Sequence, residues 1–144
     1  MKIRLYIILL VLFIFFGCIS TENAYRVDRI IRYDGIYYHH YFARGRTFAS
    51  QLRFYEDGTV IQISTHVIRD RQLELFDELF NRENENISRG NYIISGNNIY
   101  FEIINIDGII IYQGRIYNDR LIFHIYSKIN NYEEHDVEYL FRQM

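Results

Sequence analysis

Most of the chain alternates apolar and polar residues with the period of two that is typical of β-strands. The alternating runs are separated by short segments rich in Asp, Asn and Gly, which favour tight turns between antiparallel strands. Together these features predict eight strands, at residues 36–42, 50–55, 60–67, 90–95, 98–105, 109–117, 120–127 and 136–141.

The period changes between residues 69 and 80. There the apolar residues recur at spacings of three and four, at Leu73, Phe76, Leu79 and Phe80. Acidic residues lie between them, so the segment is predicted to form one amphipathic helix of about three turns. We interpret this helix as a plug over one end of the fold, and a lid over a ligand site is the alternative.

Most loops between the predicted strands are short, and short loops make sequential strands antiparallel neighbours. Eight such strands are typical of an up-and-down barrel, in which closure of the sheet removes the exposed edges. The predicted fold class is therefore all-β with one short helix, built as an eight-stranded antiparallel up-and-down barrel. A β-sandwich of two four-stranded sheets is the alternative.

Three strands alternate regularly enough for their faces to be assigned. Their apolar side chains share one face, which we assign to the interior: Ile99, Phe101, Ile103, Leu121, Phe123, Ile125, Val137, Tyr139 and Phe141. The opposite faces carry Glu102, His124, Asp136 and Glu138. Gly114 lies in the middle of a strand, where a barrel uses glycine for a bend or a close approach of two backbones.

The first 18 residues follow a different pattern. Lys2 and Arg4 precede an uninterrupted apolar run at residues 5–16, which ends at Gly17 and Cys18. A membrane-spanning helix needs about 20 apolar residues, and this run is shorter. A short basic segment, a run of about a dozen apolar residues and a small residue at the cleavage point are typical of an export signal peptide.

The pair Gly17-Cys18 resembles the lipobox of bacterial lipoproteins, although Phe15 and Phe16 stand where that family usually has a leucine and a small residue. The resemblance implies that residues 1–17 are removed and that Cys18 carries a lipid which holds the protein on a membrane. An uncleaved apolar anchor with Cys18 as a free thiol is the alternative. Because Cys18 is the only cysteine, it has no disulfide partner within the chain.

These patterns divide the chain into a signal peptide at residues 1–17, a tether at 18–32 and one barrel domain at 33–144. We expect the protein to be lipid-anchored in a bacterial cell envelope. Ile19 and Ser20 lack the aspartate that retains some lipoproteins at the inner membrane. The outer membrane or the cell surface is therefore the expected location.

Composition narrows the function further. Removing Lys2 and Arg4 with the signal peptide reduces the 16 basic residues to 14, against 18 acidic ones. Binding to nucleic acid, or to a membrane through a polybasic patch, requires a clustered basic face, so this mildly acidic domain is expected to do neither. The chain has no proline or tryptophan but 14 tyrosines and 11 phenylalanines, a composition that favours strands.

Four motifs in order carry a family resemblance. They are Asp-Gly-Ile-Tyr at 34–37, Leu-Arg-Phe-Tyr-Glu-Asp-Gly-Thr-Val at 52–60, Gly-Asn-Tyr-Ile-Ile-Ser-Gly-Asn at 90–97 and Tyr-Leu-Phe at 139–141. In order and spacing they resemble the small bacterial lipocalin-like domains that follow lipoprotein signals. The tryptophan motif that opens the larger lipocalins is absent. The resemblance implies a calycin-type barrel and no particular ligand.

Candidate chemical groups are few. His39 and His40 are adjacent on a strand, so they point to opposite faces and cannot chelate a metal together. Neither His66 nor His124 adds a spacing typical of metal ligands, and we expect surface or loop imidazoles and no metal site. The acidic pair Glu133-Glu134 and the acidic face of the helix are read as solvated, and no serine lies in a nucleophile elbow. The protein is predicted to be non-enzymatic, without a cofactor.

Two functions of different kinds remain. An eight-stranded barrel can hold one small apolar molecule, for which the candidate lining residues are Phe101, Phe123, Tyr139 and Phe141. These side chains are bulky enough to fill the barrel instead. The alternative is an interaction lipoprotein that uses an outer aromatic face against an envelope or host protein, formed by Tyr100, Ile104, Ile122 and Tyr126 beside Tyr37 or Tyr38. A lined cavity above about 300 Å³ favours the first function.

Overall fold

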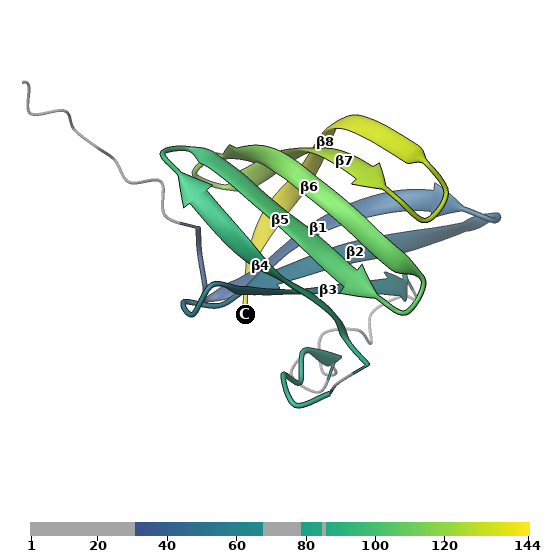
Figure 1. Ribbon diagram of the computed structural model, residues 1–144, viewed down its shortest axis with the longest axis horizontal. Helices are drawn as coiled ribbons and strands as arrows, with labels where there is room; N and C mark the ends of the chain where they lie inside the picture. The colour runs from purple at the N-terminus through teal and green to yellow at the C-terminus, as the bar shows by residue number, and fades with distance from the viewer. Residues whose placement is uncertain (1–30, 68–78, 85) are drawn as a thin grey trace, which may run out of the picture.

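The computed structural model describes residues 31–67, 79–84 and 86–144 (Figure 1). The predicted signal peptide, Cys18 and nearly all of the tether lie outside the described residues, as does the predicted helix up to residue 78. In the part of the chain that is described, no helix has the length and apolar character needed to cross a membrane.

Eight strands close into one barrel (Figure 1). They are β1 (Gly35–Ala43), β2 (Arg46–Phe54), β3 (Thr59–His66), β4 (Ser88–Ser95), β5 (Asn98–Asn105), β6 (Gly108–Ile116), β7 (Arg120–Ser127) and β8 (Tyr132–Gln143). Each strand pairs antiparallel with the next, and β1 pairs with β8 to complete the ring. The predicted eight-stranded up-and-down barrel is confirmed, and the single closed sheet excludes the sandwich.

The observed strand limits differ from the predicted ones mainly at strand ends that extend beyond the core. β5 and β7 span the predicted residues, whereas β8 begins at Tyr132, four residues before the predicted start at 136. Apart from Tyr132 the residues added to β8 are polar, and they have no apolar alternation. They are in a strand because they pair with the end of β7, Ser127 opposite Tyr132 and Tyr126 opposite Glu133. Such long-range pairing overrides local sequence preference.

The core fills one half of the barrel with aromatic side chains. The ring of Phe101 lies 5.6 Å from that of Phe54, 4.6 Å from that of Tyr112 and 5.4 Å from that of Phe123, measured between centroids. All three β5 residues assigned to the interior are buried, as are those of β7, and Phe141 packs beside them. The face assignments made from the alternation are therefore confirmed. Ile31, at the end of the predicted tether, is also buried in this core.

Two glycines allow neighbouring strands to approach closely. A Cβ atom on Gly114 would lie 2.2 Å from the carbonyl oxygen of Ile122, which confirms the close approach expected there. A Cβ atom on Gly90 would lie 1.8 Å from the carbonyl oxygen of Glu102. Neither distance leaves room for a methyl group, so both positions require glycine.

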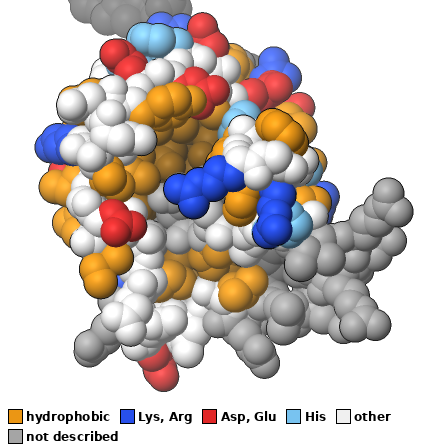
Figure 2. All heavy atoms as spheres, turned by 90° about the vertical axis from the view of Figure 1, so that its right-hand side faces the viewer, with side chains coloured by type: hydrophobic (Ala, Val, Ile, Leu, Met, Phe, Trp, Pro, Cys, Tyr) orange, Lys and Arg blue, Asp and Glu red, His pale blue; other side chains and the backbone are white. Residues whose placement is uncertain are grey.

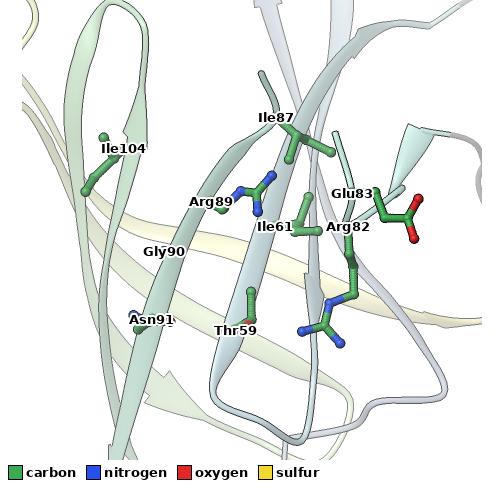
Figure 3. Close-up of a pocket in the computed structure, with 9 residues that line it drawn as sticks. All are labelled: Thr59, Ile61, Arg82, Glu83, Ile87, Arg89, Gly90, Asn91 and Ile104. Carbon is green, nitrogen blue, oxygen red and sulfur yellow. The ribbon is translucent and has the colours of Figure 1, made fainter. Parts of the chain in front are cut away.

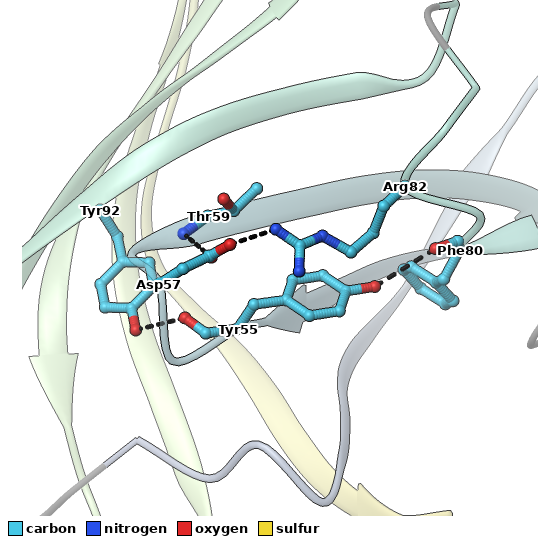
Figure 4. A network of polar contacts seen from close by, with 6 residues as sticks. All are labelled: Tyr55, Asp57, Thr59, Phe80, Arg82 and Tyr92. Atoms are coloured by element: carbon cyan, nitrogen blue, oxygen red, sulfur yellow. Dashed lines mark hydrogen bonds and ion pairs between the residues drawn. The ribbon is translucent and has the colours of Figure 1, made fainter.

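A second, smaller cluster lies on the outside of the barrel, where Ile36 of β1 and Ile61 of β3 pack with Phe80. Polar contacts hold this region together (Figure 4). The hydroxyl of Tyr55 donates to the carbonyl of Phe80 at 3.2 Å, and the carboxylate of Asp57 accepts from Arg82. The hydrogen bond from Arg82 lowers the pKa of Asp57. These contacts fasten the segment that precedes β4 to the turn between β2 and β3.

Candidate ligand-binding site

A cavity of about 720 Å³ opens at the end of the barrel where β1, β3, β5 and β7 finish. The aromatic core lies below it and closes the other half. Figure 2 views the molecule from this end and shows a hollow with hydrophobic side chains inside it and basic side chains at its edge. Pockets that bind drug-sized molecules have volumes of about 300–1,000 Å³, so the space is sufficient for one small ligand.

The cavity wall continues the inward faces of the core strands. On β1, His39 and Tyr41 follow the buried Tyr37 at intervals of two, and their rings stack on each other with centroids 6.5 Å apart. Apolar wall positions come from β6, β7 and β8: Ile110, Ile125 and Val137. The same alternation that builds the core therefore also lines the cavity, with more polar residues toward the mouth.

The floor of the cavity is a buried hydrogen-bonded cluster. Tyr139 Oη donates to Ser50 Oγ at 2.9 Å. Gln62 Nε2 donates to the same oxygen at 3.2 Å and to Tyr112 Oη at 2.9 Å. Three hydroxyls and one amide, from β2, β3, β6 and β8, thus meet at one point. A hydroxyl can rotate to donate or to accept, so this floor can satisfy either kind of polar group on a ligand.

The floor is neutral under ordinary conditions. Burial raises the pKa of Tyr139 to about 12 and raises the pKa of Tyr112 well above its usual value. Both phenols therefore keep their protons near neutral pH, and the cluster carries no charge.

The described residues of the cavity wall include a carboxylate but no lysine or arginine. Glu134 contributes a carboxylate, which accepts a hydrogen bond of 2.7 Å from the hydroxyl of Tyr132. His39 donates from Nδ1 to the carbonyl of Glu138 at 3.0 Å. Among the described residues that line the cavity there is no lysine or arginine. The interior therefore favours neutral over anionic groups.

The four residues predicted to contact a ligand lie at different depths. Tyr139 lines the cavity and belongs to its floor. Phe101 and Phe123 are buried in the core beneath it, and Phe141 packs in that core against Tyr37, with ring centroids 5.1 Å apart. Their assignment as ligand contacts stays a prediction, which the geometry supports best for Tyr139.

The polar residues of the floor are not evident from the sequence pattern. Ser50, Gln62 and Tyr112 lie on predicted strands, but serine and glutamine at inward positions look like outward ones when no strand register is known. The inward face of β2 can be followed back from the buried Phe54 and Leu52 to Ser50 in steps of two. This continuation of the apolar face indicates that the side chain of Ser50 points into the barrel.

A second hollow, of about 740 Å³, lies outside the barrel (Figure 3). It follows the line where β3 and β4 pair over the short stretch from Thr59 to Gln62, and its wall includes Arg82 and Arg89. Both cations already have partners, because Arg82 donates to Asp57 and Arg89 donates to the carbonyl of Asn84. Among the described residues that line this groove there is no buried polar cluster like the floor of the cavity, so the cavity is the stronger candidate.

Comparison of the chain with protein-family models, with curated proteins and with solved structures finds no match in any of the three. The geometry of the barrel and its cavity is therefore the basis for a functional proposal.

The two floor tyrosines give a prediction for alkaline pH. Because burial raises the pKa of Tyr139 to about 12, above that of the unfolded chain, its contribution to stability is complete below pH of about 10 and is lost as the pH rises through about 12. A difference of about two pKa units corresponds to about 3 kcal/mol. We expect cooperative unfolding in this range, measured by circular dichroism together with tyrosinate absorbance.

The variant Tyr139→Phe is the control for that titration. It removes one of the two ionisable groups of the floor and should reduce the fall of stability between pH of about 10 and 12, while Tyr112 keeps its own contribution. If all the tyrosines ionised together near pH of about 10 while the fold stayed intact, the burial of Tyr112 and Tyr139 in the floor would be contradicted.

Proposed function

We propose that the protein is a lipid-anchored envelope lipoprotein, without enzymatic activity, whose lipocalin-like barrel binds one small and largely apolar molecule in its open end. The observation that carries the proposal is the hydrogen-bonded cluster of the buried Ser50, Tyr112 and Tyr139 with the half-buried Gln62 at the bottom of an open cavity. A barrel selected only for stability is filled by apolar side chains, because buried polar groups must all be hydrogen-bonded. A polar floor under apolar walls supports ligand binding.

The charged groups around the cavity indicate which class of ligand it would bind. An apolar skeleton would lie against Ile110, Ile125 and the ring of Tyr41, with a hydroxyl, carbonyl or amide group on the floor. An anionic group placed there would lose its hydration without gaining a cation, and Glu134 would repel it. The proposed ligand is therefore a neutral amphipathic molecule that enters with its polar group first.

Two probes of matched shape test this preference. We expect 2-naphthylmethanol to bind the full chain, held in lipid nanodiscs, about tenfold or more tightly than 2-naphthoate, because only the carboxylate has an unpaired charge to bury. Titration calorimetry with empty nanodiscs as blank measures both affinities. Glu134→Gln should reduce the difference by improving binding of the acid. Equal affinities, or tighter binding of the naphthoate, would contradict the neutral-ligand proposal.

The membrane anchor is proposed from the sequence. The pair Gly17-Cys18 after the apolar run supports lipidation of Cys18, and the tether would present the barrel away from the membrane. We expect a radiolabelled fatty acid fed to the host to label the wild-type chain and not Cys18→Ala. The variant should stay in the precursor form with its signal peptide. Equal labelling of both chains would exclude Cys18 as the lipidated residue.

A second candidate function is supported by exposed apolar side chains on the outside of β4 and β5. Ile93, Tyr100 and Ile104 are exposed there, and Ile93 pairs directly with Tyr100. Of the other residues predicted for this face, Ile122 and Tyr126 are half-buried. Of the two alternatives Tyr37 and Tyr38, Tyr37 lies inside the core and Tyr38 is half-buried. This face supports an interaction lipoprotein. Loss of a cross-linked partner with Ile104→Ser would favour it over the cavity.

A further inference from the structure

Three potential metal ligands gather on the outer face of β7 and β8, away from the cavity. His124 Nε2 lies 2.7 Å from Glu133 Oε1, and His135 Nε2 lies 3.4 Å from the same oxygen. The two imidazole rings stack on each other with centroids 4.2 Å apart and planes inclined by 17°. One donor atom from each side chain lies within 4.8 Å of the other two. Two histidines and one carboxylate therefore converge on one point.

A β-bulge produces this convergence. Ile125 pairs with Glu134 but Phe123 pairs with Val137, so both His135 and Asp136 lie opposite the single residue His124. Asp136 has a φ of 54°, in the left-handed region that is uncommon for residues other than glycine. Bulges are over-represented next to functional sites, where they redirect side chains. Here the extra residue keeps Glu133 and His135 together on the side of the sheet that carries His124.

The three groups have the chemistry of a transition-metal site. Imidazole nitrogen and carboxylate oxygen bind Zn²⁺ at about 2.0–2.2 Å, and imidazole also suits Cu²⁺ and Ni²⁺. Bringing the three donors onto one ion requires rotations that unstack the rings and shorten the present separations. These rotations are open to the side chains, which are 39%, 50% and 66% exposed for His124, Glu133 and His135. Exposure also leaves further coordination positions open to water or to a partner's ligand.

We propose that His124, Glu133 and His135 form a binding site for a divalent late transition-metal ion, with Zn²⁺ as the reference ion. The site is independent of the ligand proposed for the barrel interior, because its residues lie on the opposite face of the sheet from the cavity. A structural ion pair is the alternative explanation of the cluster, but a single carboxylate in contact with two imidazoles provides more donors than one ion pair uses. The sequence did not indicate this site, since the ligands are separated by nine and by two residues and meet only through the bulged register.

The test is titration of the untagged full chain, in nanodiscs, with ZnCl₂ by calorimetry and with CuSO₄ by electron paramagnetic resonance. We expect one Zn²⁺ per chain and a Cu²⁺ spectrum with coupling to two nitrogens. His124→Ala and His135→Ala should each weaken binding by at least the roughly 10–100-fold that loss of an outer-shell partner costs, and each should remove one nitrogen coupling.

Matched variants separate a metal site from general histidine binding. His40→Ala removes an exposed histidine on β1, outside the cluster, and should leave the affinity and the spectrum unchanged. Glu133→Gln should weaken Zn²⁺ binding while both nitrogen couplings to Cu²⁺ stay. Circular dichroism checks that each variant is folded, which these exposed positions allow. Wild-type chain that binds no Zn²⁺, or binding that His40→Ala weakens as much as His124→Ala does, would overturn the proposal.

Discussion

Phe101→Ala should lower the free energy of unfolding by about 3–5 kcal/mol, the range typical of a fully buried phenylalanine. Phe101 is completely buried and its ring contacts three other aromatic rings, those of Phe54, Tyr112 and Phe123. Truncation removes these contacts and leaves a hole at the centre of the core, under the floor of the cavity. Chemical denaturation followed by circular dichroism measures the loss.

Phe42→Ala is the matched control for this variant. Phe42 lies near the end of β1 and is 74% exposed. The same chemical change there should alter the free energy of unfolding by no more than about 0.5 kcal/mol, as surface substitutions usually do. Similar losses for the two variants would mean that Phe101 does not lie at the centre of a packed core.

Gly90→Ala should also be severely destabilising, by about 3 kcal/mol or more. The added methyl group would lie 1.8 Å from the carbonyl oxygen of Glu102 and 2.9 Å from its carbon. Both atoms belong to the backbone of β5, so no side-chain rotation relieves the clash. β4 must move away from β5, which breaks hydrogen bonds between two strands of the closed ring. Thermal unfolding with the same detection measures the effect.

Gly45→Ala separates this clash from the general cost of replacing glycine. Gly45 lies in the turn between β1 and β2 with a φ of 74°, and no atom lies within 4 Å of the position of an added Cβ. The substitution therefore costs only the left-handed conformation, about 1–2 kcal/mol. If Gly45→Ala destabilised the protein as much as Gly90→Ala, the close approach of β4 and β5 would be refuted.

The sequence predicted the architecture well because the strands are local features. Regular alternation placed β5 and β7 at their observed limits, and short turns rich in Asp, Asn and Gly separated most of the strands. Alternation also assigned the inward faces correctly. A strand has only two faces, and only one choice of inward face buries Phe101, Phe123 and Tyr139. The start of β8 was missed because its charged residues are strand only through pairing with β7.

The candidate sites were less predictable because they depend on register between distant strands. Ser50, Gln62 and Tyr139 come from three separate strands, and their contact exists only once the ring is closed. The cluster of His124 with His135 depends on one extra residue in β8, which alternation alone does not reveal. Local pattern therefore identifies faces, whereas the meeting of polar groups across a barrel requires the three-dimensional structure.

If the cavity is the binding site, a ligand should stay in it when the protein is purified from its own host. Native mass spectrometry of the full chain, released from membranes of its own host, should detect one small organic molecule bound to the wild type. Ser64→Trp, which places an indole inside the cavity wall, should abolish that adduct, while Ser95→Trp, an equally exposed serine at the far end of β4, should keep it. A wild-type chain without a bound molecule, or an adduct that persists in Ser64→Trp, would contradict the account.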